Sequence, residues 1–254
     1  MIVLIYISKV RLKDDIIEGY YPYTIENIKN LKEMSFTKPI TFFVGENGTG
    51  KSTLLEAIAV ASGLNAEGGS WNFNFQTKAT HSILYRDIIL EKKDRAHTKY
   101  FLRAESFYNV ASELDRMKEE DFNYDAWFAH GGKSLHKQSH GESFIALVEN
   151  RFYPKGLYFL DEPEAALSPL KQMQLLILLQ QLVEDDCQFI IATHSHILLA
   201  SPNATIYDFD HGLEEITYEE TSHYQLYKTF LTDPKRMIER LLEENDEDTS
   251  QNEK

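Results

Sequence analysis

The sequence contains a single cysteine, Cys187, and no long apolar run. One cysteine cannot form an internal disulfide, and its place near the start of an apolar segment indicates a core residue in a reducing compartment. No apolar run approaches the roughly 20 residues that a membrane-spanning helix needs. The apolar residues 1–7 are followed by Ser8 and Lys9, without a basic leader or a small-residue cleavage site. We therefore expect a cytoplasmic protein with no segment inserted in a membrane.

Positive charge is also scarce, with 26 Lys and Arg against 40 Asp and Glu and a formal charge of −14. This balance disfavours diffuse electrostatic binding of nucleic acid, which needs clustered cations to release counterions from phosphates. A local basic patch stays open as an alternative. Residues 243–248 form an acidic run, and we expect an acidic, disordered tail over 241–254.

Apolar residues make up 43% of the chain, which is enough for the sizeable core of a globular α/β domain. We expect one domain over 1–240, with a β/α lobe inserted at 72–150 that ends in a helical run. From Gly156 onward, apolar strands alternate with helical segments, which is typical of a parallel sheet. The expected strands are Ile2–Val10, Tyr23–Asn27, Ile40–Val44, Ser82–Leu90, Thr98–Arg103, Leu157–Leu160, Phe189–Ala192 and Thr205–Asp208. The expected helices are Lys51–Ala61, Val110–Lys118, Phe144–Val148 and one that begins after Ser168.

Residues 45–52, with the sequence GENGTGKS, match the phosphate-binding pattern GxxxxGK[ST] between an expected strand and an expected helix. Glycines in such a loop let backbone N–H groups surround phosphate oxygens, and the helix N-terminus adds positive potential. Lys51 would reach the β- and γ-phosphates, and Ser52 would offer its hydroxyl to Mg²⁺. The sequence therefore predicts a nucleoside triphosphate site. Its binding residues are Asn47, Gly48, Thr49, Gly50, Lys51, Ser52 and Thr53.

Two carboxylates follow the apolar strand 157–160, and a histidine follows the next strand. Asp161 would help to hold Mg²⁺, whereas Glu162 would position or polarise the attacking water. His194 lies in Thr193–Ser195, after the strand 189–192. Because the carboxyl ends of parallel strands meet at one edge of a sheet, we expect His194 beside Glu162 and close to the γ-phosphate.

A second phosphate-facing element is predicted at residues 139–143, with the sequence SHGES, just before an apolar helical run. Small residues at a helix start expose N–H donors to an anion. The candidates are Ser139, Gly141 and Glu142. A single active site rarely needs two such elements, so this one points to an unusual arrangement.

Taken in order, these four elements resemble the head of an ABC-type P-loop ATPase of the soluble kind, similar to SMC and RecF proteins. The similarity implies an α/β fold of the ABC-ATPase type, with a mixed sheet core and the inserted β/α lobe. It also implies Mg-ATP hydrolysis. In that family the element that corresponds to residues 139–143 is called the signature. The signature of one subunit closes over the ATP held by another, so a homodimer forms on ATP binding. Ser139, Gly141 and Glu142 would then act in trans.

The chain departs from the family pattern at several positions. Ser168 stands where the family has a D-loop aspartate, which puts the coupling of the two sites in doubt. Gln138 replaces a signature leucine, and His140 replaces a glycine. The Q-loop residue, which would contact Mg²⁺, is Glu105 by its spacing, with Gln76 as the alternative. An aromatic platform for adenine would fall near Tyr20, Tyr21 or Tyr23.

Three functional classes of ABC-type protein are considered for this sequence. A soluble head would use ATP-driven dimerisation to switch an unidentified protein partner, in DNA repair or phage defence. The segment from Ser52 to Ser139 is too short for long coiled-coil arms, so such a head would be armless. The alternative is the nucleotide-binding subunit of a membrane transporter, which is disfavoured by Glu105 in place of the Q-loop glutamine that faces membrane domains. A non-hydrolysing module is disfavoured because Glu162 is present.

Overall fold

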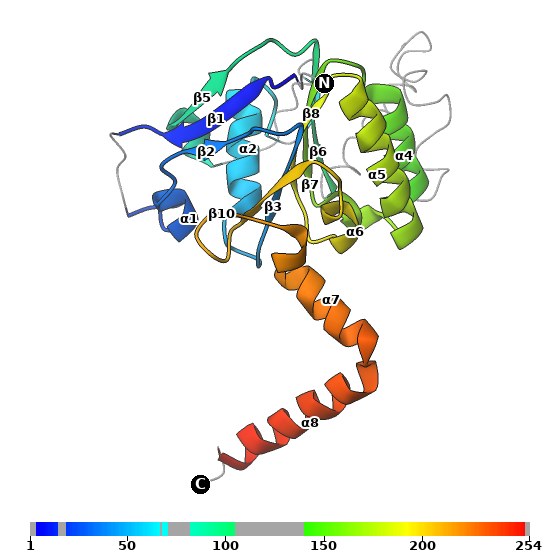
Figure 1. Ribbon diagram of the computed structural model, residues 1–254. Coiled ribbons are helices and arrows are strands. Elements are labelled where there is room, and N and C mark those ends of the chain that lie inside the picture. The colour runs from blue at the N-terminus through cyan, green and yellow to red at the C-terminus, as the bar shows by residue number, and fades with distance from the viewer. Residues whose placement is uncertain (1–3, 15–18, 67, 71–81, 105–139, 252–254) are drawn as a thin grey trace, which may run out of the picture. The chain divides into compact units, whose positions relative to one another are not determined.

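A computed structural model describes residues 4–14, 19–66, 68–70, 82–104 and 140–251 (Figure 1). The chain divides into two compact units, the larger ending at Ile216 and the smaller beginning at Thr217. This division lies before the predicted boundary at residue 240. Within the described ranges, no helix combines the length and apolar character that crossing a bilayer requires.

A seven-stranded sheet forms the centre of the larger unit. Its strands, in spatial order, are β10 (Glu214–Ile216), β9 (Ala204–Asp208), β3 (Ile40–Val44), β8 (Gln188–Ala192), β7 (Gly156–Asp161), β6 (Thr98–Arg103) and β4 (Gly69–Ser70). The five strands from β9 to β6 run parallel, and the two edge strands are antiparallel. Every residue of β3, β7 and β8 is buried, as expected for strands covered on both faces. The carboxyl ends of the parallel strands therefore share one edge.

A smaller sheet packs over α2 (Lys51–Ala61). It consists of β1 (Ile7–Leu12) between β2 (Met34–Ser35) and β5 (Ile88–Lys92), all antiparallel. One hydrophobic cluster joins Val10 of this sheet, Ile58 of α2 and Phe159 of the central sheet. The helix that follows the glycine loop is thus held between two sheets.

Gln188 fixes the small sheet to β8 from a fully buried position. Its side-chain oxygen accepts hydrogen bonds from the backbone N–H groups of Tyr6 (2.8 Å) and Ile7 (2.9 Å). Its amide nitrogen donates to the carbonyl oxygen of Ile7 (2.9 Å). A buried amide without such partners would cost about 1–3 kcal/mol, so the burial of Gln188 enforces this attachment.

Helices α4 (His140–Arg151) and α5 (Pro169–Glu184) lie side by side, on the opposite side of the central sheet from α2 (Figure 1). They bury Phe144 and Leu147 of α4 and Leu175 and Leu179 of α5. The 3₁₀ turn η4 (Pro163–Ala166) and the short helix α6 (His196–Leu199) connect these layers to β7 and β8. Cys187 is 1% exposed, which confirms the prediction of a core residue.

The smaller unit contains η5 (Tyr218–Glu220), α7 (Ser222–Thr232) and α8 (Pro234–Gln251). The side chain of Thr217 closes a capping box with Glu220, and Thr221 caps α7 through the backbone N–H of Tyr224 (3.2 Å). The expectation of a disordered tail from residue 241 differs from this structure, because α8 stays helical to Gln251.

Several predicted elements are confirmed, among them β3, α2 and β6 with the predicted bounds. The predicted strand Tyr23–Asn27 is wrong, since this segment forms a turn and the short helix α1 (Glu26–Lys29). The segment Ser82–Leu90 is not a single strand. Ser82 caps the 3₁₀ turn η1 (Ile83–Arg86) through the N–H of Leu84, and β5 follows.

The first strand begins at Ile7 rather than at Ile2, and residues 1–3 lie outside the described ranges. The predicted helix Val110–Lys118 also lies outside them. Within the predicted lobe 72–150, β5 pairs with β1 and β6 pairs with β7. The described strands of that segment thus belong to the two sheets.

Candidate functional site

The glycine loop leaves the end of β3 and enters α2 with positive φ at Gly45 (138°), Gly48 (86°) and Gly50 (101°). A Cβ atom on Gly45 would lie 3.0 Å from Oδ1 of Asp210, and one on Gly50 would lie 3.0 Å from Cγ2 of Ile25. Both conformation and space therefore require glycine at these two positions. The loop curls around the start of α2, as a phosphate-binding backbone does.

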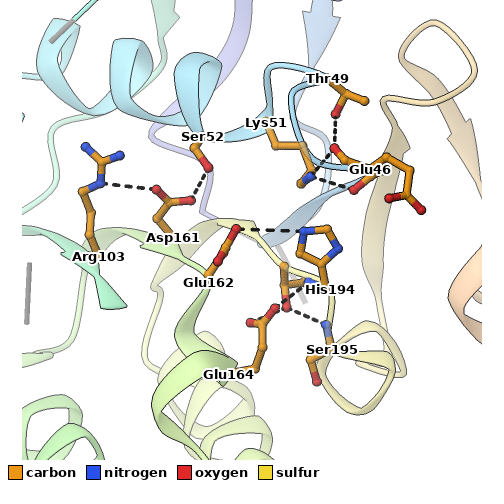
Figure 2. Close-up of polar contacts among 12 residues, drawn as sticks. Glu46, Thr49, Lys51, Ser52, Arg103, Asp161, Glu162, Glu164, His194 and Ser195 are labelled. Atoms are coloured by element: carbon orange, nitrogen blue, oxygen red, sulfur yellow. Dashed lines mark hydrogen bonds and ion pairs between the residues drawn. The ribbon is translucent and has the colours of Figure 1, made fainter. Parts of the chain in front are cut away.

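Lys51 is the first residue of α2 and is 5% exposed. Its ammonium donates hydrogen bonds to the carbonyl oxygens of Gly45 (2.6 Å) and Glu46 (2.8 Å), as Figure 2 shows. Burial lowers the pKa of Lys51, while the carboxylates of Glu162 and Asp210 act in the opposite direction. The loop thus encloses a cation whose present partners are neutral carbonyls, which an anion can replace.

Ser52 and Asp161 meet where α2 faces the end of β7. The hydroxyl of Ser52 donates to Oδ1 of Asp161 at 2.7 Å, and Nε of Arg103 lies 3.3 Å from Oδ2 of the same carboxylate (Figure 2). A hydroxyl beside a carboxylate is an oxygen donor set that suits Mg²⁺. No group of three or more His, Cys, Asp or Glu within the described residues could hold a metal alone. The pair therefore fits Mg²⁺ bound together with phosphate oxygens.

Glu162 and His194 lie side by side at the ends of β7 and β8, as predicted. Glu162 adopts a left-handed conformation (φ 49°), and its backbone N–H donates to the carbonyl of Ala192 (2.9 Å). Its side chain is 42% exposed, and Oε1 lies 3.9 Å from Nε2 of His194. The turn directs this carboxylate away from the sheet, to a place that water can reach.

Glu164 is a residue of this edge whose role the sequence did not reveal. Its Oε2 accepts a hydrogen bond from the hydroxyl of Thr193 (2.7 Å), and its Oε1 accepts from the backbone N–H of His194 (2.5 Å). The Thr193 hydroxyl in turn accepts from the N–H of Ser195 (3.0 Å). Glu164 thus fixes the backbone that carries His194. A third carboxylate so soon after a strand end was the signal that could have identified it.

Asn27 and Asp210 hold the glycine loop from the opposite side. Asn27 is 9% exposed, and its Nδ2 donates to the carbonyl oxygens of Thr49 (2.9 Å) and Phe209 (2.6 Å). Oδ1 of Asp210 accepts from the backbone N–H of Glu46 (2.7 Å). A cavity of about 500 Å³ lies among the same segments, next to Gly48 and Thr49. No local sequence pattern marked these two supporting residues.

The three candidate tyrosines for adenine occupy different environments. Tyr21 is 57% exposed, and its hydroxyl lies 3.2 Å from Oγ1 of Thr53, the third residue of α2. Tyr23 is buried and donates its hydroxyl proton to Asp87, and Tyr20 packs edge-on against Tyr23. Of the three, Tyr21 therefore has the position and the exposure that a stacking surface next to the loop requires.

The remaining predicted site residues are only partly within the described ranges. Ser139, Glu105 and Gln76 lie outside them. Gly141 and Glu142 form the first turn of α4, where Glu142 is exposed. A Cβ on Gly141 would lie 3.2 Å from the carbonyl oxygen of Ala166. The start of α4 thus packs closely on η4. The last of the predicted binding residues, Asn47, is exposed at the tip of the glycine loop.

Comparison with known proteins identifies several similar chains. The RecF DNA replication and repair protein of Leptospira interrogans (serovar copenhageni) is 49% identical over 45 residues, which are 17% of this chain and 12% of RecF. The match therefore spans only a small part of that relative. CbiO1 from Clostridium perfringens, part of the ABC transporter complex cbiONQ, shares the fold with a TM-score of 0.50 and 18% identity, over 94% of this chain and 99% of cbiO1.

The SMC head domain from Thermotoga maritima also aligns, with a TM-score of 0.43 and 18% identity, over 80% of this chain and 94% of the head. A family model described as an AAA domain matches residues 17–253. That range includes the glycine loop, both strand-end carboxylates, His194 and the start of α4. The chain therefore belongs to the AAA domain family.

Proposed function

We propose that this protein binds and hydrolyses Mg-ATP and that ATP binding drives its dimerisation. One observation carries the proposal: Lys51, Ser52 with Asp161, and Glu162 with His194 converge on one sheet edge. These groups are a phosphate-binding cation, a magnesium-binding oxygen pair and a carboxylate able to orient water.

Each side chain has a distinct task in this proposal. The ammonium of Lys51 exchanges its carbonyl partners for β- and γ-phosphate oxygens, and the hydroxyl of Ser52 and the carboxylate of Asp161 hold Mg²⁺. When bound, Mg²⁺ neutralises charge on the phosphates. Glu162 accepts a hydrogen bond from the attacking water, and His194 lies where it can contact the γ-phosphate.

The proposed dimer depends on residues 139–142, at the start of helix α4. Ser139, Gly141 and Glu142 would reach the ATP of a second copy, where N–H groups at the start of α4 face the γ-phosphate. The exposure of Glu142 supports this use of the helix start. Release of phosphate would then open the pair, and an unidentified protein partner would respond to that motion in the cytoplasm.

Glu162→Gln tests the proposal because it removes the base and keeps the shape. We expect ATP turnover to fall about 100-fold or more and the ATP-bound dimer to accumulate in light scattering. Glu33→Gln, in an exposed ion pair with Lys9, is the matched control and should leave both readouts unchanged. Unaltered turnover in Glu162→Gln would exclude the proposed role of Glu162. Turnover per molecule that is independent of protein concentration would exclude action of the helix start in trans.

A nucleotide-binding subunit of a membrane transporter is the alternative, favoured by the shared fold with cbiO1. The match to a RecF DNA replication and repair protein favours a role in DNA repair instead, although the charge of −14 gives no support for contact with naked DNA. Fractionation of cells that produce the tagged protein separates these options. Stable recovery with membranes and a permease would favour the transporter, and recovery with a nuclease and DNA would favour repair or defence.

A further inference from the structure

Arg103 links the proposed magnesium site to a second, buried carboxylate. It is the last residue of β6, and its side chain is 22% exposed. Nε lies 3.3 Å from Oδ2 of Asp161, while a terminal guanidinium nitrogen lies 2.7 Å from Oε2 of Glu56 in α2. The same nitrogen donates to the carbonyl of Ala66 (3.3 Å). One cation is therefore shared by two carboxylates that are 11% and 8% exposed.

Asp161 consequently has both oxygens engaged. Oδ1 accepts from the hydroxyl of Ser52 at 2.7 Å, and Oδ2 faces Arg103. Glu56 is held independently, because its Oε1 also accepts from the backbone N–H of Ser82 (3.2 Å). A cation next to a carboxylate lowers that carboxylate's attraction for a second cation, and the effect is strong where little water screens it.

We propose that Arg103 makes metal binding at Asp161 depend on bound nucleotide, with Glu56 setting how strongly Arg103 acts. This inference rests on the proposed function, in which Asp161 holds Mg²⁺. Without nucleotide, Arg103 neutralises Asp161, so that the Ser52–Asp161 pair alone attracts little metal. With nucleotide, the phosphate charges offset the guanidinium, and the metal enters together with them. Arg103 is a positioning residue, since it acts through Asp161.

Removal of Arg103 and removal of its other carboxylate partner, Glu56, should change metal binding in opposite directions. Arg103→Gln removes the competing cation, which lowers the metal concentration needed for half-saturation. Glu56→Gln removes one of the two carboxylates that share Arg103. The charge of Arg103 then acts more strongly on Asp161, so the metal concentration needed for half-saturation rises. A merely structural role for the ion pair would instead weaken metal binding in both variants.

Binding of Mn²⁺ to the full chain tests this inference. The binding is measured as the decrease in the EPR signal of free Mn²⁺. Titrations are made without nucleotide and with saturating ADP, using Mn²⁺ as the stand-in for Mg²⁺. Each titration with ADP is compared with the same titration without protein, because ADP alone also binds Mn²⁺. With ADP, we expect the half-saturating concentration to fall about fivefold in Arg103→Gln and to rise about fivefold in Glu56→Gln. Without nucleotide, Arg103→Gln should bind Mn²⁺ measurably better than the wild type.

Three variants complete the experiment. Arg103→Lys keeps the charge and should stay within about twofold of the wild type, and Lys9→Gln, in an exposed ion pair with Glu33, is the surface control. The double variant Glu56→Gln, Arg103→Gln removes both members of the Arg103–Glu56 ion pair together, so it remains informative if a single variant does not fold. Because Glu56 acts through Arg103, the half-saturating concentration of the double variant should be close to that of Arg103→Gln.

The outcomes separate this inference from the proposed function. If ADP does not enhance Mn²⁺ binding by the wild type, or if Asp161→Asn leaves that enhancement intact, the proposed metal role of Asp161 fails. If ADP enhances binding but Arg103→Gln and Glu56→Gln shift in the same direction, the inference is overturned. The same holds if the double variant binds Mn²⁺ no better than the wild type.

Discussion

The edge of the central sheet that carries the glycine loop and the C-terminal helices α7 and α8 differ in the contacts that hold them. At the edge, several polar groups are held by partners distant in sequence, such as Asn27 with Phe209 or Glu46 with Asp210. In the helices no residue of 222–243 is buried, and the contacts that fix them are mostly local caps. Long-range contacts give a geometry precise enough for chemistry, whereas local ones suffice only for helix formation.

Truncation of a leucine in each region gives the largest expected contrast. Leu179 in α5 is fully buried, and Leu231 in α7 is 71% exposed. We expect Leu179→Ala to lower the free energy of unfolding by about 3 kcal/mol, through lost burial and a cavity. Leu231→Ala should change it by less than about 0.5 kcal/mol. Urea denaturation followed by circular dichroism measures both values, and equal losses would contradict the contrast.

A pair of glycines sharpens the comparison at smaller scale. Gly50 and Gly212 both have positive φ, but only a Cβ on Gly50 would press on neighbours, with Ile25 at 3.0 Å. Gly212→Ala should cost about 1 kcal/mol from its conformation alone. Gly50→Ala should cost about 2 kcal/mol or more, because Ile25 and Ile28 must also move. Thermal unfolding of the two variants under one condition gives the difference, and equal midpoints would show that the contact is unimportant.

The thiol of Cys187 offers a chemical test of how closed the sheet is. Burial raises the pKa of Cys187 to about 11, and the side chain donates to the carbonyl of Tyr153 (3.3 Å). The native protein should therefore react with a thiol reagent at neutral pH at least about 100-fold more slowly than the urea-unfolded chain. Rapid labelling of the folded protein would indicate that β8 opens readily.

The smallest expected effect concerns His211, which is 72% exposed on the turn after β9. A hydrogen bond to Asp208, and then its charge, raise the pKa of His211 above the ordinary 6.5. The stabilisation is therefore complete below the unfolded pKa of 6.5 and is lost as the pH rises through the higher folded pKa. NMR titration should show this elevated pKa, which Asp208→Asn should return to the ordinary range. A normal value in the wild type would contradict the contact.

Local pattern predicted much of this architecture but not the supports of its site. The strand Ile40–Val44 and the helix Lys51–Ala61 were predicted with their observed bounds, because apolar runs and glycines encode them within a short window. The strand expected at Tyr23–Asn27 was wrong, since Asn27 turns its side chain to partners at Thr49 and Phe209. No window of sequence contains a partner 182 residues away.

The candidate site shows the same limit. Lys51, Asp161, Glu162 and His194 could be placed because each ends or begins an element of a parallel sheet, which fixes where it emerges. Glu164 and Arg103 make side-chain contacts that depend on how neighbouring elements pack. Their roles became visible only once those elements had been placed.

The central claim is that the glycine loop and Lys51 form a nucleotide site at this edge, and calorimetric titration of Mg-ATP tests it most directly. The wild type should bind, and Lys51→Ala should lose about 100-fold in affinity, equivalent to about 2.7 kcal/mol. Lys9→Ala, at the surface, is the control and should bind as the wild type does. Equal affinity of Lys51→Ala and the wild type would contradict the account.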